Sequence, residues 1–494
     1  MTSSSPSTLP NFRVVGFSGH RQINEPALIA EVIRDELERL RRSSADEWIA
    51  LSSVAEGSDQ LFVEQARALG MSRHAVLPLP SAEFAKDFSA AGWSKVEALL
   101  AMAEHVRVIN ENGTREDAYL DCGIETVNGA DVLLAVWDGD EARGKGGTGD
   151  VVAYARSLGK PVIAIDAVTR AVHRENMEKL AAGDGSLSAL NRLPENSAGW
   201  GDNPFNAPDF IFAFQQKCDY AASHGAPQVR RFIVATVILH VAATIIAAAA
   251  LSYGLHLGVV PWLKLFCLAS ALGVALMLRY HHSHHHWVRC RLASEFCRSA
   301  LATWGLPRAA PLFEDIDLPA VRALTRSLHI FHSRSAAARP VSMDEFRRVY
   351  VDKRIDDQLA YYRRQEGRAL PLFARLKAGF WLATILALVS TLAYAICHSV
   401  EMPVPEWVTT TVFYFVPITL PVVAAALISL ISINDLQRRV ARYREMQEVL
   451  NDSRARVAFC LTWNSLERIV LKTERALLQE VLEWHSITSF AESH

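Results

Sequence analysis

The sequence predicts an α/β domain built on a parallel sheet, followed by an all-α transmembrane region. Short apolar runs alternate with amphipathic stretches from residue 13 to residue 166, which is the pattern of a sheet with crossover helices. Four long apolar runs follow in the second half of the chain. The composition, 50% hydrophobic with 21% charged residues, fits a polar domain joined to lipid-embedded segments.

The totals limit the class of protein. A chain of 494 residues is long enough for about two or three domains. The formal net charge of −2 has no polyelectrolyte character, so nucleic acid is not an expected partner. Seven scattered cysteines form no CxxC pair, which favours reduced thiols: Cys122, Cys218, Cys267, Cys290, Cys297, Cys397 and Cys460.

The predicted sheet domain covers residues 13–166. Amphipathic segments such as Ala27–Leu40 and Gln60–Leu69 separate its strands. The strand candidates are Val14–Phe17, Trp48–Ser52, His74–Leu79, Val106–Ile109, Val132–Trp137 and Val162–Ile165. Val132–Trp137 is continuously apolar, as expected of a strand covered on both faces.

Polar segments flank and divide the predicted domains. Residues 1–12 are rich in Ser, Pro and Thr and are predicted to be a disordered lead-in rather than a signal peptide. Residues 167–229 are predicted to form a connecting region with a helix near Asp209–Ala222. Residues 305–342 are predicted to be a second connection.

Four apolar runs have roughly the twenty residues that a membrane span needs. They are Phe232–Leu251, Val259–Leu278, Ala378–Ile396 and Val408–Ile433. The link within each pair has no Lys or Arg, whereas the outer flanks are basic: Arg230, Arg231, Arg279, Arg289, Arg291, Arg375, Lys377, Arg438 and Arg439. The positive-inside rule therefore predicts two helical hairpins in the plasma (inner) membrane, with both chain termini cytoplasmic. Buried core helices of a soluble protein are the alternative, and the matched charge asymmetry disfavours it.

Long cytosolic helices are expected to extend both hairpins. The first hairpin with its extension covers residues 230–304, and the second with its extensions covers residues 343–494. The second span is predicted to run on to Trp304, and a helix over Met343–Glu366 to precede the third. No Gly or Pro follows Val422, which predicts that the fourth span continues into a cytosolic helix. An apolar stripe along it, interrupted by Ser453, predicts contact with another helix: Tyr443, Met446, Leu450, Val457 and Leu461.

Three glycine-bearing loops follow predicted strands and form the candidate ligand site. Ligands of open parallel sheets bind beyond the carboxyl ends of the strands, and free N–H groups at a helix start favour phosphate. Arg21 is the candidate to pair with a phosphate, and Asp59 or Asp138 to accept a ribose hydroxyl. Tight strand–helix turns without a ligand are the alternative, and the absence of a Walker Lys-Ser/Thr argues against a P-loop NTPase. The candidate ligand-binding residues are Ser18, Gly19, His20, Arg21, Glu56, Gly57, Ser58, Asp59, Asp138, Gly139, Gly146, Gly147, Thr148, Gly149 and Asp150.

The N-terminal domain resembles the SLOG superfamily, a Rossmann-like group that contains DprA-like proteins and the LOG phosphoribohydrolases. The resemblance is carried by Gly16–Arg21 (GFSGHR), Glu56–Asp59 (EGSD) and Ala130–Asp150, where GADVLLAVWDG is followed by GGTGD. LOG enzymes carry PGGxGTxxE; here Lys145 replaces the Pro and Asp150 is the acid nearest to the missing Glu. That departure favours sensing over hydrolysis. SLOG domains of bacterial defence proteins, and the similar domains of melastatin-type TRP channels, bind NAD-derived or ADP-ribose-type ligands, which is what the resemblance implies here.

The membrane half looks like the SLATT effector families, whose transmembrane hairpins often accompany SLOG domains. The matching stretches are Tyr350–Arg364 (YVDKRIDDQLAYYRR), Trp287–Glu295 (WVRCRLASE) and Trp463–Trp484, which contains Glu474 and Glu480. The resemblance implies an effector that responds to a nucleotide second messenger by acting on the membrane.

Other conspicuous residues keep two interpretations. His240 inside the first span either lines a pore or titrates, or makes a helix–helix hydrogen bond. Pro417 and Pro421 are expected to kink the fourth span, as a gating hinge or a packing bend. Cys122 is a candidate nucleophile or a structural thiol, the second being favoured because no paired histidine lies nearby in sequence. The five histidines His281, His282, His284, His285 and His286 form a polar collar, with a metal site as the alternative.

Together with the residues, the SLOG and SLATT resemblances imply a receptor that acts as a membrane effector in antiphage defence. A nucleotide-derived signal (NAD, ADP-ribose type or a cyclic nucleotide) is expected to bind the sheet edge and rearrange a homo-oligomer, so that the lipid bilayer becomes permeable. No cofactor is expected beyond this ligand. The alternatives are a membrane-anchored N-glycosidase using Arg21, Glu56 and Asp150, and a scaffold with a ligand-free sheet domain.

Overall fold

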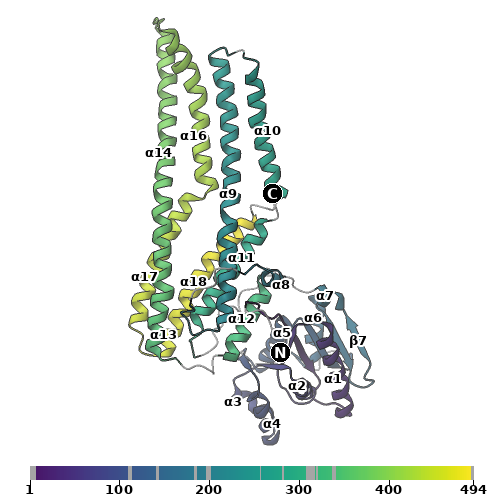
Figure 1. Cartoon of the computed structure of the whole chain (residues 1–494). Helices are drawn as coiled ribbons and strands as arrows, with labels where there is room; N and C mark the ends of the chain where they lie inside the picture. Colours follow the sequence, from purple (N-terminus) through teal and green to yellow (C-terminus); the bar gives the residue numbers. More distant parts are fainter. Residues whose placement is uncertain are drawn as a thin grey trace. The chain divides into compact units, whose positions relative to one another are not determined.

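The structure is a computed structural model. It describes residues 7–109, 114–140, 144–182, 186–195, 202–255, 257–280, 283–307, 318, 321–335 and 341–490. The chain divides into two compact units. The sheet unit comprises Met1–Arg192 with Phe313–Arg339, and the helical unit comprises Leu193–Leu312 with Pro340–His494 (Figure 1).

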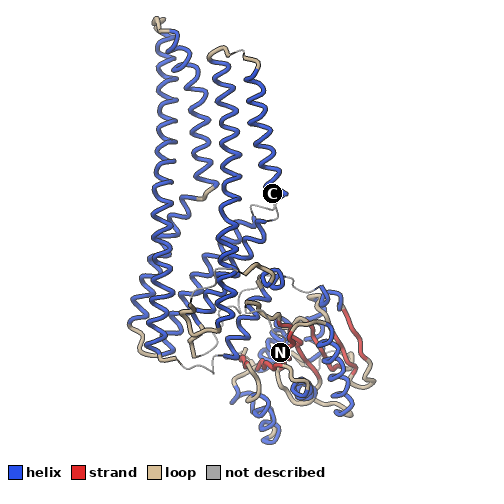
Figure 2. Tube along the Cα trace, in the orientation of Figure 1, coloured by secondary structure: helices blue, strands red, loops and turns tan. Residues whose placement is uncertain are grey.

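The sheet unit is built on a seven-stranded sheet in the order β4-β3-β2-β1-β5-β6-β7. Figure 2 shows its strands in red. All neighbouring strands are parallel except β7, which runs antiparallel to β6. The six predicted strands are confirmed, each within two residues at its ends, while β7 was not predicted. The strands are β1 (Phe12–Gly19), β2 (Glu47–Ser52), β3 (Ser72–Leu77), β4 (His105–Val108), β5 (Val132–Trp137), β6 (Val162–Asp166) and β7 (Val172–Glu175). The strand order reverses between β1 and β5, so the sheet has a Rossmann-like switch point there.

Alternation along the strands produces two apolar faces. In β1, Val15 and Phe17 join the core cluster that contains Ile33 of α1, whereas Phe12 and Val14 join a second cluster on the other face. The helices of this unit are α1 (Pro26–Ser43), α2 (Ser58–Ala68), α3 (Ser81–Phe84), η1 (Ala85–Asp87), α4 (Ala90–Leu100), α5 (Arg115–Gly129), α6 (Thr148–Ser157), α7 (Met177–Ala182), α8 (Ser186–Asn191) and α12 (Arg322–Ser335).

Helix α12 comes from the segment that the sequence assigns to a connection, yet it covers the second face of the sheet. Its Ile330 is 2% exposed and lies in the cluster with Phe12 and Val14, and Phe331 packs edge-on against Phe12 with ring centroids 5.5 Å apart. Arg326 Nη1 donates to Asp131 Oδ2 at 2.5 Å. A helix more than 300 residues from β1 in sequence thus completes the sheet unit.

The first residues also belong to this unit. Leu9 is 1% exposed, and its backbone exchanges hydrogen bonds of 3.0 and 2.8 Å with the Asn191 side chain. Phe12 already forms part of β1. The prediction of a disordered lead-in is therefore wrong for residues 7–12, because apolar side chains spaced three apart are buried against the domain; residues 1–6 lie outside the described part.

Within the described residues, the helical unit contains four helical segments that are long and apolar enough to cross a membrane, judged by length and composition. They are Phe232–Ser252, Val259–Met277, and the apolar parts of the stretches Met343–Ser399 and Glu406–Ala458. The elements are α9 (Asp209–Ser252), α10 (Val259–Tyr280), α11 (Ser283–Thr303), α13 (Met343–Tyr350), η2 (Val351–Asp356), α14 (Asp357–Ser399), α15 (Glu406–Val408), η3 (Thr409–Phe415), α16 (Val416–Ile433), α17 (Leu436–Ala458) and α18 (Trp463–Phe490).

The C-terminal helix is less continuous than predicted. Asp435 adopts a left-handed φ of 47° between α16 and α17, and α17 ends at Ala458, before α18 begins. Of the predicted stripe, the four residues up to Val457 are buried in α17. Leu461 is 84% exposed because it lies beyond the end of that helix. Ser453, which interrupts the stripe, is buried and accepts a hydrogen bond of 2.9 Å from Thr473 of α18.

Three histidines are packed together where α12 meets strands β3 and β4. The ring of His105 lies 5.6 Å from that of His74 and 5.0 Å from that of His329. Burial is the main cause that lowers the pKa of His74 and of His329 to about 3, and neighbouring imidazoles, with Arg334 for His74 and Arg107 for His329, act in the same direction. The docked helix therefore requires neutral histidines.

We expect the sheet unit to lose stability in mild acid. An unfolded histidine titrates near pH 6.5, far above the folded values, so the unfolded chain takes up protons first. The stabilising contribution of the neutral histidines to the free energy of unfolding is complete above pH ~6.5. It is lost progressively as the pH falls toward about 3. Urea denaturation of the full-length protein in detergent, repeated between pH ~7.5 and ~5, measures this slope.

The matched control is the double variant His74→Phe, His329→Phe. It retains every carboxylate of the parent, so the difference between the two pH profiles isolates the histidines. We expect a flatter profile for the double variant. Equal slopes would contradict the assignment of acid sensitivity to this cluster.

Candidate functional site

The three predicted glycine loops meet at the switch point of the sheet. They follow β1, β2 and β5, which are adjacent strands, and all three lie at the carboxyl ends. The first loop leads into α1, the second begins α2 at Ser58, and the third begins α6 at Thr148. The structure thus brings together residues that are up to about 130 positions apart in sequence, as expected for this fold.

Glycine is required where the first two loops touch. Gly57 has a φ of +91°, and a Cβ there would lie 2.2 Å from the carbonyl oxygen of Arg21. A Cβ on Gly19 would lie 2.1 Å from Oγ of Ser58. The Ser58 amide and hydroxyl both donate to the His20 carbonyl, at 3.1 and 2.9 Å. The glycines therefore permit close backbone packing between the two loops.

His20 connects the first loop to the third. Its amide donates to the Val136 carbonyl at 3.1 Å, and its Nε2 lies 3.2 Å from the Asp138 amide and 3.0 Å from Asp138 Oδ1. Burial acts to raise the pKa of Asp138, but hydrogen bonds from the Asp140 amide and from His20 outweigh it, so the net pKa is lowered. Asp138 is therefore an ionised acceptor near the surface, with its side chain 18% exposed. Gly139 beside it is exposed.

Asp59 is buried, whereas a residue that accepts a hydrogen bond from a ribose hydroxyl has to be accessible to the ligand. It is 2% exposed, and its Oδ1 accepts from the hydroxyls of Ser52 and Ser53 at 3.1 and 2.9 Å. Burial raises its pKa to about 7, although both serines act in the opposite direction. Val54, between the serines and Glu56, has a φ of 55°, which is strained for a β-branched residue. Of the two candidate ribose acceptors, Asp138 is the accessible one, and Glu56 is also exposed.

The third loop is closed by its own acid. Asp150 Oδ2 accepts from the Gly146 amide at 2.9 Å, so this carboxylate stabilises the loop. Gly146 has a φ of +82°, and a Cβ there would lie 2.5 Å from the Leu120 amide nitrogen of α5. Thr148 is 8% exposed at the start of α6, and Gly147 and Gly149 flank it, half-buried. Residues 141–143 of this loop lie outside the described part.

Arg21 is exposed and lies over the ring of Tyr119, with its guanidinium carbon 5.4 Å from the ring centroid. The Tyr119 hydroxyl donates to Asp87, which also accepts from Arg115 at 2.6 Å. Burial, with the hydrogen bond to Asp87, raises the pKa of Tyr119 to about 12. Sequence reasoning missed Tyr119 and Asp87, since neither lies in a glycine motif; they orient the cation that the loop presents.

The other residues singled out in the sequence are Cys122, His240, the two prolines and the five histidines. Cys122 is 2% exposed, its thiol donates to the Val76 carbonyl at 3.2 Å and burial raises its pKa, all of which fits a structural thiol. His240 lies in the apolar part of α9. Pro417 is the second residue of α16, which follows the π-helical turn η3, and Pro421 lies inside α16. His281 and His282, and the side chains of His284, His285 and His286, lie outside the described residues.

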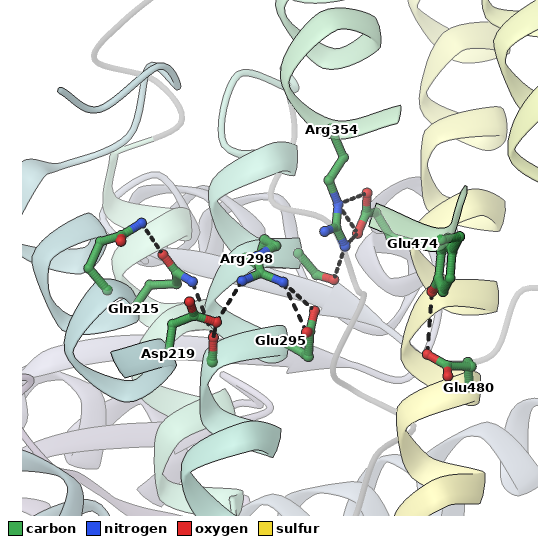
Figure 3. A network of polar contacts seen from close by, with 11 residues as sticks. Gln215, Asp219, Glu295, Arg298, Arg354, Glu474 and Glu480 are labelled. Atoms are coloured by element: carbon green, nitrogen blue, oxygen red, sulfur yellow. Dashed lines mark hydrogen bonds and ion pairs between the residues drawn. The ribbon is translucent and has the colours of Figure 1, made fainter. Parts of the chain in front are cut away.

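A second polar site lies inside the helical unit, away from its apolar spans. Arg354 of η2 and Glu474 of α18 form a bidentate ion pair, with Nε–Oε1 2.9 Å and Nη2–Oε2 2.6 Å (Figure 3). The two side chains are 2% and 0% exposed. The Tyr350 hydroxyl donates to Glu474 at 2.9 Å, and Arg354 Nη2 donates to Ser299 of α11 at 3.1 Å. The two stretches on which the SLATT resemblance partly rests are thus in direct contact.

The network extends to α9 through Arg298. This side chain donates to Glu295 at 2.9 Å and to Asp219 at 2.9 Å, and Ser294 links Asp219 to Gln215 (Figure 3). Burial acts to raise the pKa of Glu295, but Arg298 and other arginines outweigh it, so its pKa is lowered. Hydrogen-bonded charges, buried at Arg354 and Glu474 and partly exposed at Arg298 and Asp219, connect α9, α11, η2 and α18.

Glu480 is the exception in this network. Burial raises its pKa, and Tyr362 donates to it at a long 3.4 Å (Figure 3). Among the described residues, its one hydrogen bond is this long one, so burial is not offset by a close partner.

No protein-family model matches the chain, and no curated protein matches it either.

We expect Gly57→Ala to destabilise the sheet unit more than Gly70→Ala. Both glycines have positive φ, but nothing lies within 4 Å of a Cβ on Gly70, whereas Gly57 meets the Arg21 backbone. The shared strain costs about 1 kcal/mol, and the clash should add roughly 1–3 kcal/mol at position 57. Thermal unfolding of the full-length variants measures the difference. Equal melting temperatures would show that the loops separate freely.

We expect Glu474→Leu to destabilise the helical unit by roughly 3–5 kcal/mol, because it leaves Arg354 buried without its counter-ion. The double variant Arg354→Met, Glu474→Leu should recover much of that loss. Asp452→Ala, which removes an exposed partner of Arg456, is the control and should cost less than about 1 kcal/mol. Melting temperatures in detergent compare the three. A double variant no more stable than Glu474→Leu contradicts this account.

Proposed function

We propose that the protein is a membrane effector that senses a nucleotide-derived signal on its sheet unit and responds through its helical unit. The observation that carries the proposal is the path of the chain. It leaves the helical unit after α11, contributes α12 to the sheet unit, and returns as α13, which continues into the third candidate span. Any change in how the sheet holds α12 therefore acts on the connection between the first and second pairs of candidate spans.

The chemistry of the switch point supports a phosphate-containing ligand. An exposed arginine, an ionised Asp138 and two glycine loops leading into helices lie on adjacent strands. NAD, ADP-ribose-type molecules and cyclic nucleotides carry both the phosphate and the hydroxyl groups that such residues bind. The SLOG and SLATT resemblances point to the same ligands and to antiphage defence.

Two carboxylates of the site already have partners within the protein, which favours a receptor over an N-glycosidase. Asp150 accepts from the Gly146 amide, and Asp59 is buried under two serine hydroxyls. Acid–base catalysis needs a carboxyl group within reach of the substrate, and of the two acids named for the glycosidase only Glu56 is exposed. Binding without turnover is therefore the proposed behaviour.

The membrane topology is part of the proposal. The four candidate spans form two hairpins, and the basic flanks orient both termini toward the cytoplasm of a plasma (inner) membrane. Four spans make a poor pore alone, so the active form is a homo-oligomer. The ligand acts by binding one arrangement of the oligomer better than another.

The test is ligand binding followed by vesicle leakage with the full-length protein. NAD, ADP-ribose and cyclic nucleotides are screened by thermal shift and calorimetry, and the best binder is added to liposomes that contain the protein and a trapped dye. Arg21→Ala should weaken binding roughly ten- to hundredfold, because it removes a charge-assisted contact. Arg42→Ala, which removes an exposed arginine at the far end of α1, should leave it unchanged.

Three outcomes decide between the functions. Binding with ligand-dependent leakage supports the effector. Release of a free base from NAD or a nucleotide would establish the glycosidase instead. Failure of every nucleotide to bind would leave the ligand-free scaffold.

A further inference from the structure

The exposed surfaces of the candidate spans differ in kind. Helices α10 and α14 expose large apolar side chains along their length, as lipid-facing helices do. Examples are Trp262, Leu265, Phe266 and Leu272 of α10, and Trp381, Leu382, Ile385 and Leu388 of α14. Helix α9, which packs against α10, α11 and α16, exposes the polar residues His240 and Thr244 in addition to Ile238 and Leu251.

His240 lies deep within its span. It is eight residues beyond Phe232, the first residue of the span, which corresponds to roughly 12 Å at 1.5 Å per residue. Long lysine and arginine side chains reach the headgroups from such positions, but an imidazole is too short. The ring must therefore find its polar surroundings at this depth.

One nitrogen of the ring is satisfied and the other is not. His240 Nδ1 lies 2.8 Å from the carbonyl oxygen of Thr236, an acceptor, so Nδ1 carries the hydrogen. Nε2 is then an acceptor, and no described residue donates to it. An unpaired polar atom in hydrocarbon costs about 2–7 kcal/mol. Lipid provides no donor.

The polar surface continues one turn to either side. Thr236, half-buried, and Thr244, exposed, lie four residues before and after His240, on the same face of the helix. Their hydroxyls donate to the carbonyls of Phe232 and His240 at 3.0 and 2.9 Å, which leaves oxygen lone pairs directed outward. We call Thr236, His240 and Thr244 the α9 stripe.

We propose that the α9 stripe faces the same stripe of a second copy of this chain across a water-filled space, and so lines the path that the oligomer opens. This inference rests on the proposed function. Every group of the stripe offers an acceptor, so two stripes do not bind each other directly, but one water molecule donates two hydrogen bonds and satisfies the Nε2 atoms of two copies. Such a contact repeats identically around a symmetry axis.

The test compares two cysteine variants in liposomes. His240→Cys lies on the stripe, and Ile238→Cys is its control, since Ile238 is 56% exposed in the same span but about 200° away around the helix. A charged methanethiosulfonate reagent is added, and the modification of each cysteine is followed by mass spectrometry, with the native cysteines as internal references. We expect the cysteine at 240 to react at least about tenfold faster, because thiolate formation requires water.

A bifunctional methanethiosulfonate reagent with a flexible spacer then tests the partner, because cysteines on two sides of a water layer lie farther apart than the roughly 7 Å between Cα atoms that a disulfide tolerates. His240→Cys should form cross-linked dimers, and Ile238→Cys should not. Thr244→Cys repeats both measurements with His240 retained, in case the first variant is unstable. Equal, slow modification of the two positions overturns the inference, and so does fast modification of position 240 without cross-linking.

Failure of this inference is distinguishable from failure of the proposed function. If the protein remains in the membrane after alkaline extraction and leaks dye with ligand, but the stripe is unreactive with and without that ligand, only the lining is wrong. If the protein is extracted by alkali, the proposed membrane function fails as well.

Discussion

The structure depends on the burial of one apolar face of the sheet by α12, a helix from a distant part of the chain. Phe12, Ile49 and Val76 point to the face that α12 covers, and Ile330 completes their cluster. Without α12 these side chains would contact water, at about 25 cal/mol per Å² of apolar surface. The sheet unit is consequently complete only when the chain has made an excursion through the first pair of candidate spans and returned.

Polar contacts determine the position of α12 on that face. Arg326 reaches Asp131 and the Phe12 carbonyl at the amino ends of β5 and β1, and Arg334 reaches Glu104, Glu47 and Ser72. These bonds lie at the opposite edge of the sheet from the glycine loops. A ligand at the carboxyl edge would therefore act on α12 through the strands themselves, which gives the proposed sensing an indirect but continuous route.

The interactions that stabilise the helical unit differ from those that stabilise the sheet unit. Its core outside the spans is held by buried ion pairs as well as by apolar packing. Replacing such pairs by apolar residues is often neutral for stability, and in some proteins they specify one arrangement of helices. Arg354 lies in a π-helical turn, and its Nη1 is buried without a hydrogen-bond partner. π-Helical turns inside α-helices occur frequently at functional sites.

Local sequence patterns predicted some features of this protein, and only the tertiary structure determined the others. The strands, the glycine loops at the switch point and the four candidate spans could be predicted, because strand alternation, turn residues and hydrophobic length act over a few to about twenty residues. The burial of Asp59, the Tyr119–Asp87 support of Arg21, the contact of Arg354 with Glu474 and the docking of α12 were decided by the folded chain alone. Each of these features joins segments that are far apart in sequence. A local sequence pattern contains no information on which distant partner a side chain will contact.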